Sequence, residues 1–157
     1  MRLNTLSVKS CAVRRRSLLV VGDLFIDGTA LLNLVERAFG SKFDLVSPLD
    51  WMPVDYLRAY AERLIAAGPS ILPSGRCELL VCPECGDLGC GCISCVVARD
   101  GDFIAWSELG WETSDDPTGI SLFPMGGFRF AAASLAGTLG LPGVTDSGAA
   151  ADPGRCL

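Results

Sequence analysis

The chain has 157 residues, half of them hydrophobic, so it can bury the core of one domain without help from a metal or a disulfide. Its 13 Lys and Arg against 18 Asp and Glu give a net charge of -5, and this acidic balance argues against nucleic acid as a partner. The absence of histidine removes the commonest general base and the usual Ser/His and Cys/His nucleophile pairs.

The N-terminal segment is basic and shows no apolar periodicity. Its Lys and Arg residues all precede the first acidic residue, Asp23, and we expect residues 1–16 to be a disordered basic N-terminus. The apolar residues that follow resemble an export signal, but Gly22 and Asp23 interrupt them. Since no segment approaches membrane-spanning length, we expect a cytoplasmic protein without a membrane partner.

Residues 17–138 predict a single α+β domain, in which a small antiparallel sheet or meander carries a cysteine knuckle and two or three helices cover one face. Residues 18–26 predict a β-hairpin with Gly22 and Asp23 at or near its turn. Apolar residues at helical spacing predict a first helix from about Leu31 to the capping Gly40, and a second over residues 54–67.

The pattern then changes to short strands over residues 77–81, 91–99 and 103–108, with a tight turn at Asp100 and Gly101 joining the last two. Another strand near residues 128–130 and a short Ala-rich helix complete the domain. Residues 139–157, rich in Gly, Ala, Pro and Asp, predict a flexible C-terminal tail.

Five of the eight cysteines lie in the 14 residues from Cys82 to Cys95. In a reducing compartment such a cluster indicates metal binding or thiol chemistry rather than disulfides. The CxxC pair of Cys82 and Cys85 lets two thiolates converge on one ion, and Gly86 frees backbone amides to hydrogen-bond the sulfurs. The competing interpretation is a tight turn that contains reduced thiols and no metal.

Strand parity predicts the remaining ligands. If residues 90–97 are extended, Cys90 and Cys92 share one face while Cys95 points to the other, and Cys95 and Cys77 belong to the core. The predicted metal ligands are therefore Cys82, Cys85, Cys90 and Cys92. Four thiolates close the coordination sphere of a structural ion, and zinc is expected ahead of iron.

The pentapeptide from Cys82 to Gly86 is similar to the knuckles of zinc ribbons and rubredoxins, which pair two such knuckles around one ion. More widely, the chain carries Leu80–Gly91, then Trp106, Trp111-Glu112 and Gly127–Phe130. This order resembles small bacterial proteins, particularly actinobacterial ones, of uncharacterised activity, some of which carry an oxidoreductase label.

The resemblance covers about residues 17–138. It implies a shared site that uses Cys82, Cys85 and Cys90 with one further group, because Cys92 and Cys95 depart from the pattern of those proteins. Asp87 is the nearest candidate for that further ligand, since zinc also accepts carboxylate oxygen.

Two functions remain open. The first is a metal-binding module, with a structural zinc, for a protein or small-molecule partner that the sequence does not identify. The alternative is a thiol-disulfide oxidoreductase in which Cys82 attacks and Cys85 resolves, and this function needs a thiolate of low pKa. We expect no such thiolate, because the glycines after Cys85 disfavour a helix there and Glu84 and Asp87 would raise the pKa of nearby thiols.

Overall fold

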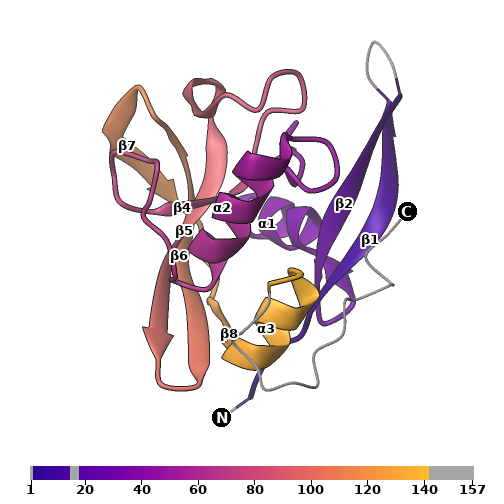
Figure 1. Cartoon of the computed structure of the whole chain (residues 1–157). Helices are drawn as coiled ribbons and strands as arrows, with labels where there is room; N and C mark the ends of the chain where they lie inside the picture. The colour runs from indigo at the N-terminus through magenta and orange to yellow at the C-terminus, as the bar shows by residue number, and fades with distance from the viewer. Residues whose placement is uncertain (1, 15–17, 142–157) are drawn as a thin grey trace.

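The computed structural model describes residues 2–14 and 18–141. Over these residues the chain forms two antiparallel sheets and three α-helices, which confirms the α+β class (Figure 1). The strands are β1 (Leu6–Arg14), β2 (Leu18–Ile26), β3 (Thr29–Ala30), β4 (Cys77–Leu80), β5 (Cys92–Asp100), β6 (Phe103–Thr113), β7 (Asp116–Leu122) and β8 (Phe128–Ala131). The helices are α1 (Leu31–Phe39), α2 (Val54–Leu64) and α3 (Ala132–Thr138), with a 3₁₀ turn, η1, over Leu88–Cys90.

The basic N-terminal segment is part of the first sheet. Residues 6–14, expected to be disordered, form β1, which pairs with β2 along its whole length. The segment is ordered because Leu6 and Val8 alternate into the core while their neighbours face solvent. Residues 1, 15 and 16 of the expected disordered segment lie outside the described residues.

The predicted hairpin over residues 18–26 is instead one continuous strand, β2. Gly22 does not turn the chain; it pairs with Ser10 and donates its amide to the Leu49 carbonyl at 2.9 Å. A Cβ at Gly22 would lie 2.8 Å from the Asp50 carboxylate and 3.1 Å from the Leu49 Cβ. The glycine therefore serves a close approach between β2 and the Leu49 loop rather than a turn.

The second sheet has the strand order β4-β5-β6-β7, with β8 also paired to β6. One edge of β6 pairs with β5, and the other edge is divided: its first half pairs with β8 and its second half with β7. The expected strands are therefore present, and the tight turn between β5 and β6 falls on Gly101 and Asp102, one residue later than expected. β6 extends five residues beyond the predicted end at Glu108, to Thr113, and β7 was not predicted.

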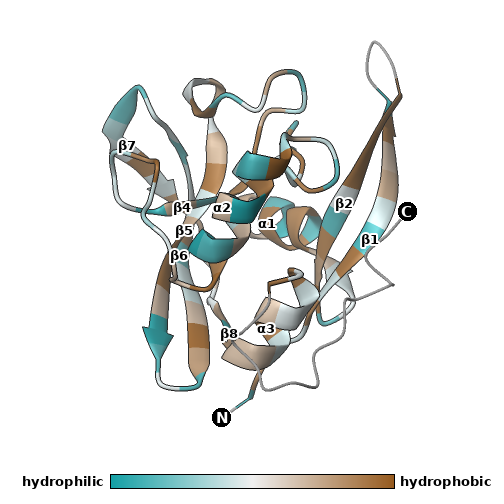
Figure 2. Ribbon diagram, viewed as in Figure 1, coloured by the Kyte–Doolittle hydropathy of each residue, from teal (hydrophilic) through white to brown (hydrophobic). Residues whose placement is uncertain are grey.

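The helices lie between the two sheets, whereas the sequence predicted a single sheet covered on one face (Figure 1). Helix α1 packs against β2, and α3 contacts both β1 and β8. Helix α2 is fixed to the second sheet by Tyr60, whose hydroxyl donates to the Leu79 carbonyl at 2.8 Å. Both α1 and α2 carry hydrophobic and hydrophilic residues, so each helix buries one face in the core and leaves another face exposed to solvent (Figure 2).

The ends of the elements follow from backbone conformation. Helix α1 ends as predicted at Gly40, which adopts φ 84°. Helix α2 ends at Leu64, earlier than the predicted Ala67, and Ala66 adopts φ 60°.

Leu139, at the start of the expected flexible tail, is buried; residues 142–157 of that tail lie outside the described residues. No helix among the described residues is both long and apolar enough to cross a membrane.

Candidate metal centre

The loop between β4 and β5 begins with a tight turn over the CxxC pair. The Gly86 amide donates to the Cys82 carbonyl at 2.8 Å, and Gly86 adopts φ 70°. The next amide, of Asp87, donates to the Cys85 sulfur at 3.4 Å. This is the arrangement expected of a metal knuckle, in which backbone amides hydrogen-bond a ligand sulfur.

The knuckle is held from outside by the loop that precedes α2. A Cβ at Gly86 would lie 2.7 Å from the Met52 sulfur and 3.6 Å from the Trp51 ring, so both side chains close over the glycine. Trp51 is itself fixed, since its indole Nε1 donates to the Ser47 carbonyl at 2.6 Å. Gly86 is thus required twice, for its positive φ and for the space that Met52 occupies.

The second half of the loop returns the chain to the knuckle through η1. The Asp87 carboxylate accepts from the Gly89 amide at 2.9 Å, and the Cys90 amide donates to the Asp87 carbonyl at 3.1 Å. Gly91 then adopts φ 99° directly against the ring of Trp111, where a Cβ would lie 2.5 Å from a ring carbon. These contacts place Cys90 opposite Cys85.

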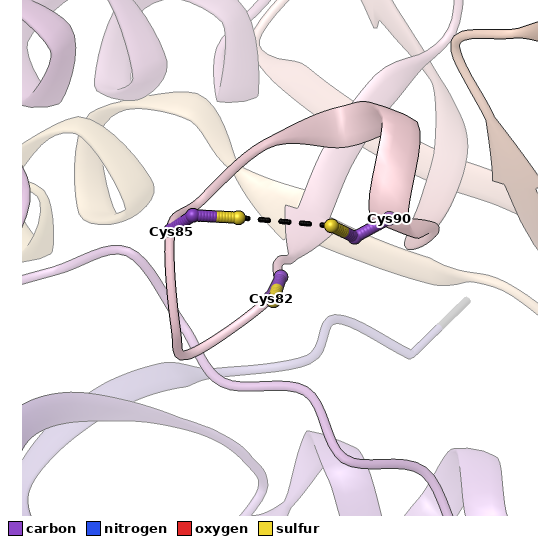
Figure 3. Close-up of side chains that lie close together, drawn as sticks. All are labelled: Cys82, Cys85 and Cys90. Atoms are coloured by element: carbon purple, nitrogen blue, oxygen red, sulfur yellow. Dashed lines mark hydrogen bonds between the residues drawn. The ribbon is translucent and has the colours of Figure 1, made fainter. Parts of the chain in front are cut away.

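Three cysteine sulfurs converge in this loop. The Sγ atoms of Cys82, Cys85 and Cys90 all lie within 4.8 Å of one another, and those of Cys85 and Cys90 are 3.6 Å apart (Figure 3). Around a tetrahedral zinc with Zn–S bonds of about 2.3 Å, two sulfurs are about 3.8 Å apart. The three thiols, of which Cys85 and Cys90 are exposed, are therefore spaced to hold one metal ion.

Cys92, the fourth predicted ligand, is not brought to this group. It is the first residue of β5, fully buried, and pairs with Glu112. The extended run expected from Cys90 does not exist, because Cys90 lies in η1 and Gly91 breaks the strand, so strand parity begins only at Cys92. Burial and the carboxylate of Glu112 raise the pKa of Cys92 to about 12, which keeps this thiol neutral.

The other sequence candidates are also placed. Cys77 and Cys95 are opposite one another on β4 and β5, and both belong to the core, as predicted. Asp87, the alternative ligand, uses its carboxylate to cap η1 through the Gly89 amide and is not part of the three-cysteine group. The structure thus brings together three of the four predicted ligands, Cys82, Cys85 and Cys90.

The three thiols differ in acidity. Burial raises the pKa of Cys82, but hydrogen bonds from the amides of Glu84 and Cys85 and from the thiols of Cys85 and Cys90 lower it below the ordinary value. Hydrogen bonds with Cys85 and Cys82 raise the pKa of Cys90 to about 11. The expectation that no thiol here would have a lowered pKa is therefore wrong for Cys82, because backbone amides and neighbouring thiols hydrogen-bond its sulfur.

No protein-family model, curated protein or solved structure matches this chain, so its chemistry is inferred from the site itself. In the described part of the chain, the candidate group consists of Cys82, Cys85 and Cys90. Three thiolates are soft ligands that suit zinc, Cu(I) or iron–sulfur chemistry. The eighth cysteine of the sequence, Cys156, lies outside the described residues.

Proposed function

We propose that the protein is a small zinc-binding module that uses the loop between β4 and β5 to engage a protein or small-molecule partner. Cys82, Cys85 and Cys90 hold the ion. The convergence of their three sulfur atoms within 4.8 Å is the observation that carries this proposal. A single ion on a CxxC knuckle favours zinc over an iron–sulfur cluster, which needs four cysteines around a larger volume.

The coordination that supports this function differs from the closed four-sulfur site that the sequence predicted. Three protein ligands leave one position of a zinc tetrahedron open, as in sites that exchange their fourth ligand. Because Cys85 and Cys90 are exposed, that position is accessible from solvent. A partner's thiol or carboxylate completes the tetrahedron, so the ion both fixes the loop and takes part in binding.

The site operates in a reducing compartment, and we place the protein in the cytoplasm on that ground. The seven described cysteines are all free. In an oxidising compartment, the exposed Cys85 and Cys90 with sulfurs 3.6 Å apart would be converted to a disulfide and lost as ligands. Zinc binding protects these thiolates from the same reaction.

A competition titration of the reduced full-length chain with a chromogenic zinc chelator tests the proposal. Cys85→Ser should weaken zinc binding by at least about tenfold, the scale on which even residues outside the ligand set affect zinc sites. Cys11→Ser is the matched control, since Cys11 lies on β1 and outside the three-cysteine group. Equal zinc affinity in the two variants would contradict the assignment. The same titration of a Cys156→Ser variant of the parent chain determines whether this chain supplies the fourth ligand.

A thiol-disulfide oxidoreductase is the second candidate, and the exposed pair of Cys85 and Cys90 favours it. Their sulfurs are 3.6 Å apart, so Cys90 is a further thiol within reach of the predicted pair of Cys82 and Cys85. The two functions make opposite predictions for the protein loaded with one equivalent of zinc. Reduction of a small disulfide at the same rate with and without zinc supports the oxidoreductase, whereas ligation by the three cysteines masks the thiolates and stops the exchange.

A further inference from the structure

A polar pocket of about 210 Å³ lies at the end of α2, away from the cysteine knuckle in the sequence. It is formed by the loop after α2, the start of β4 and one residue of β5. Two arginines, Arg63 and Arg76, line it, and none of its lining residues is Asp or Glu. In a chain with 18 acidic and 13 basic residues, a pocket lined by two cations and no carboxylate is a distinctive feature.

Arg63 is fixed in the pocket wall by an ion pair. Its Nε donates to Glu78 Oε1 at 3.2 Å and its Nη2 to Glu78 Oε2 at 2.6 Å, and the two side chains are 4% and 0% exposed. Tyr56 also donates its hydroxyl to Glu78 Oε2, at 2.6 Å. These bonds hold the guanidinium in one orientation and do not use its Nη1, which has two further N–H groups.

Arg76, the second lining arginine, is fixed in the same way. Its Nε donates to Ser94 Oγ at 2.9 Å and to Glu112 Oε2 at 3.0 Å. Its Nη2 donates to the Ser94 carbonyl at 3.1 Å and to the Glu108 carbonyl. Again Nη1 is the donor that these bonds leave unused. Both guanidinium groups are therefore held in position before any ligand arrives, which lowers the entropic cost of binding one.

The electrostatics of the pocket follow from which groups line it. Glu78 and Glu112 neutralise the charges of the two arginines. Neither carboxylate lines the pocket, so the charged groups that a bound molecule contacts there are the two guanidinium groups. The remaining ionisable group of the lining is Cys77, whose pKa is raised well above its ordinary value by burial, so it is a neutral thiol that does not repel an anion. Small residues, Ala66, Gly68 and Gly75, leave the space between the arginines open.

We propose that this pocket binds a phosphate-sized oxyanion, which Arg63 and Arg76 contact through their Nη1 groups. Planar guanidinium groups match the oxygens of phosphate and carboxylate groups. A volume of 210 Å³ corresponds to about seven water molecules, which suits a free anion or the phosphoryl group of a small metabolite. The site is independent of the zinc proposal, because it shares no residue with the three-cysteine group.

Val97 offers a way to test the site without removing either arginine. It lines the pocket from β5 and is half-buried, so a longer polar side chain fits there with its end toward the cavity. Val97→Glu introduces a carboxylate that competes with an anion for both guanidinium groups. Val97→Gln is the matched control, with the same shape and no charge.

The measurement is calorimetric titration of the full-length protein with inorganic phosphate at constant ionic strength. We expect saturable binding to the parent protein, similar binding to Val97→Gln, and binding weaker by roughly tenfold or more to Val97→Glu. A small phosphomonoester that binds more tightly than phosphate identifies a metabolite as the occupant, and equal binding identifies the free ion. Absence of saturable phosphate binding, or equal binding to the Glu and Gln variants, would overturn the proposal.

Discussion

The sulfur atoms of Cys85 and Cys90 lie 3.6 Å apart because two separate turns bring them together. The first turn is closed by Gly86, under Met52, and the second ends at Gly91, against Trp111. Each turn is closed by its own backbone hydrogen bonds and does not depend on a metal ion. The thiols are consequently preorganised, and preorganised ligands bind a metal without the cost of ordering the loop.

The contact between Gly91 and Trp111 predicts an unusually costly substitution. Gly91→Ala places a Cβ 2.5 Å from the Trp111 ring at φ 99°, whereas Gly101→Ala meets nothing within 4 Å at φ 61°. We expect Gly101→Ala to lower the free energy of unfolding by about 1 kcal/mol from backbone strain. Gly91→Ala should cost roughly 2–4 kcal/mol, because overpacking adds to strain. Urea denaturation measures both, and equal losses would contradict the close contact.

The buried ion pair between Arg63 and Glu78 predicts a large loss of stability when one partner is removed. Arg63→Met leaves the fully buried Glu78 carboxylate without its cation, at a cost of about 3–5 kcal/mol. Arg58 is the matched control on the same helix. Its pair with Glu62 is 4.0 Å long and its side chain is 73% exposed, so Arg58→Met should cost less than about 1 kcal/mol. Similar unfolding free energies for both variants would show that the Arg63 pair is solvated.

The unequal acidity of the thiols predicts the order in which the metal-free protein reacts with iodoacetamide. The thiolate is the nucleophile, so the rate at each cysteine rises with pH until that thiol is ionised. The pKa of Cys82 is below the ordinary thiol value, and that of Cys90 is about 11. The pH midpoint of alkylation should therefore be lower for Cys82 than for Cys90. Peptide mapping by mass spectrometry measures both midpoints, and the reverse order would contradict the hydrogen bonds to Cys82.

Elements with a complete local signal were predicted from the sequence. Helix α1 combines amphipathic spacing with a capping glycine at Gly40, and the hairpin of β5 and β6 has a glycine, Gly101, in its two-residue turn. β1 was missed because only Leu6 and Val8 mark its buried face, and the arginines that follow are typical of a solvated terminus. β7 is almost wholly exposed and has no apolar alternation, so it is recognisable only from its pairing with β6.

The three-cysteine group was predicted only in part. The CxxC spacing identified Cys82 and Cys85, but the choice between Cys90 and Cys92 depends on the backbone at Gly91, whose φ of 99° is set by distant contacts with Trp111. One residue in an unexpected conformation moves every later side chain to the other face. Met52 carried no signal at all, because it is more than 30 positions from Gly86 in the sequence.

The two pocket arginines were not identified from the sequence, because their contacts also join residues that are far apart in the chain. Arg63 and Glu78 are 15 residues apart and Arg76 and Glu112 are 36 apart, on elements whose contact depends on the complete fold. A charged residue in a sequence is most often solvated, and only the fold shows that these four are buried.

Zinc stoichiometry in three forms of the full-length protein tests the metal centre most directly. The parent chain, Cys90→Ser and Cys92→Ser should be purified under reducing conditions and examined by native mass spectrometry with elemental analysis. If Cys82, Cys85 and Cys90 hold the ion, the parent and Cys92→Ser retain one zinc per chain and Cys90→Ser loses it. Zinc that is retained in Cys90→Ser and lost in Cys92→Ser, or a parent chain that binds no zinc at all, would contradict this metal centre.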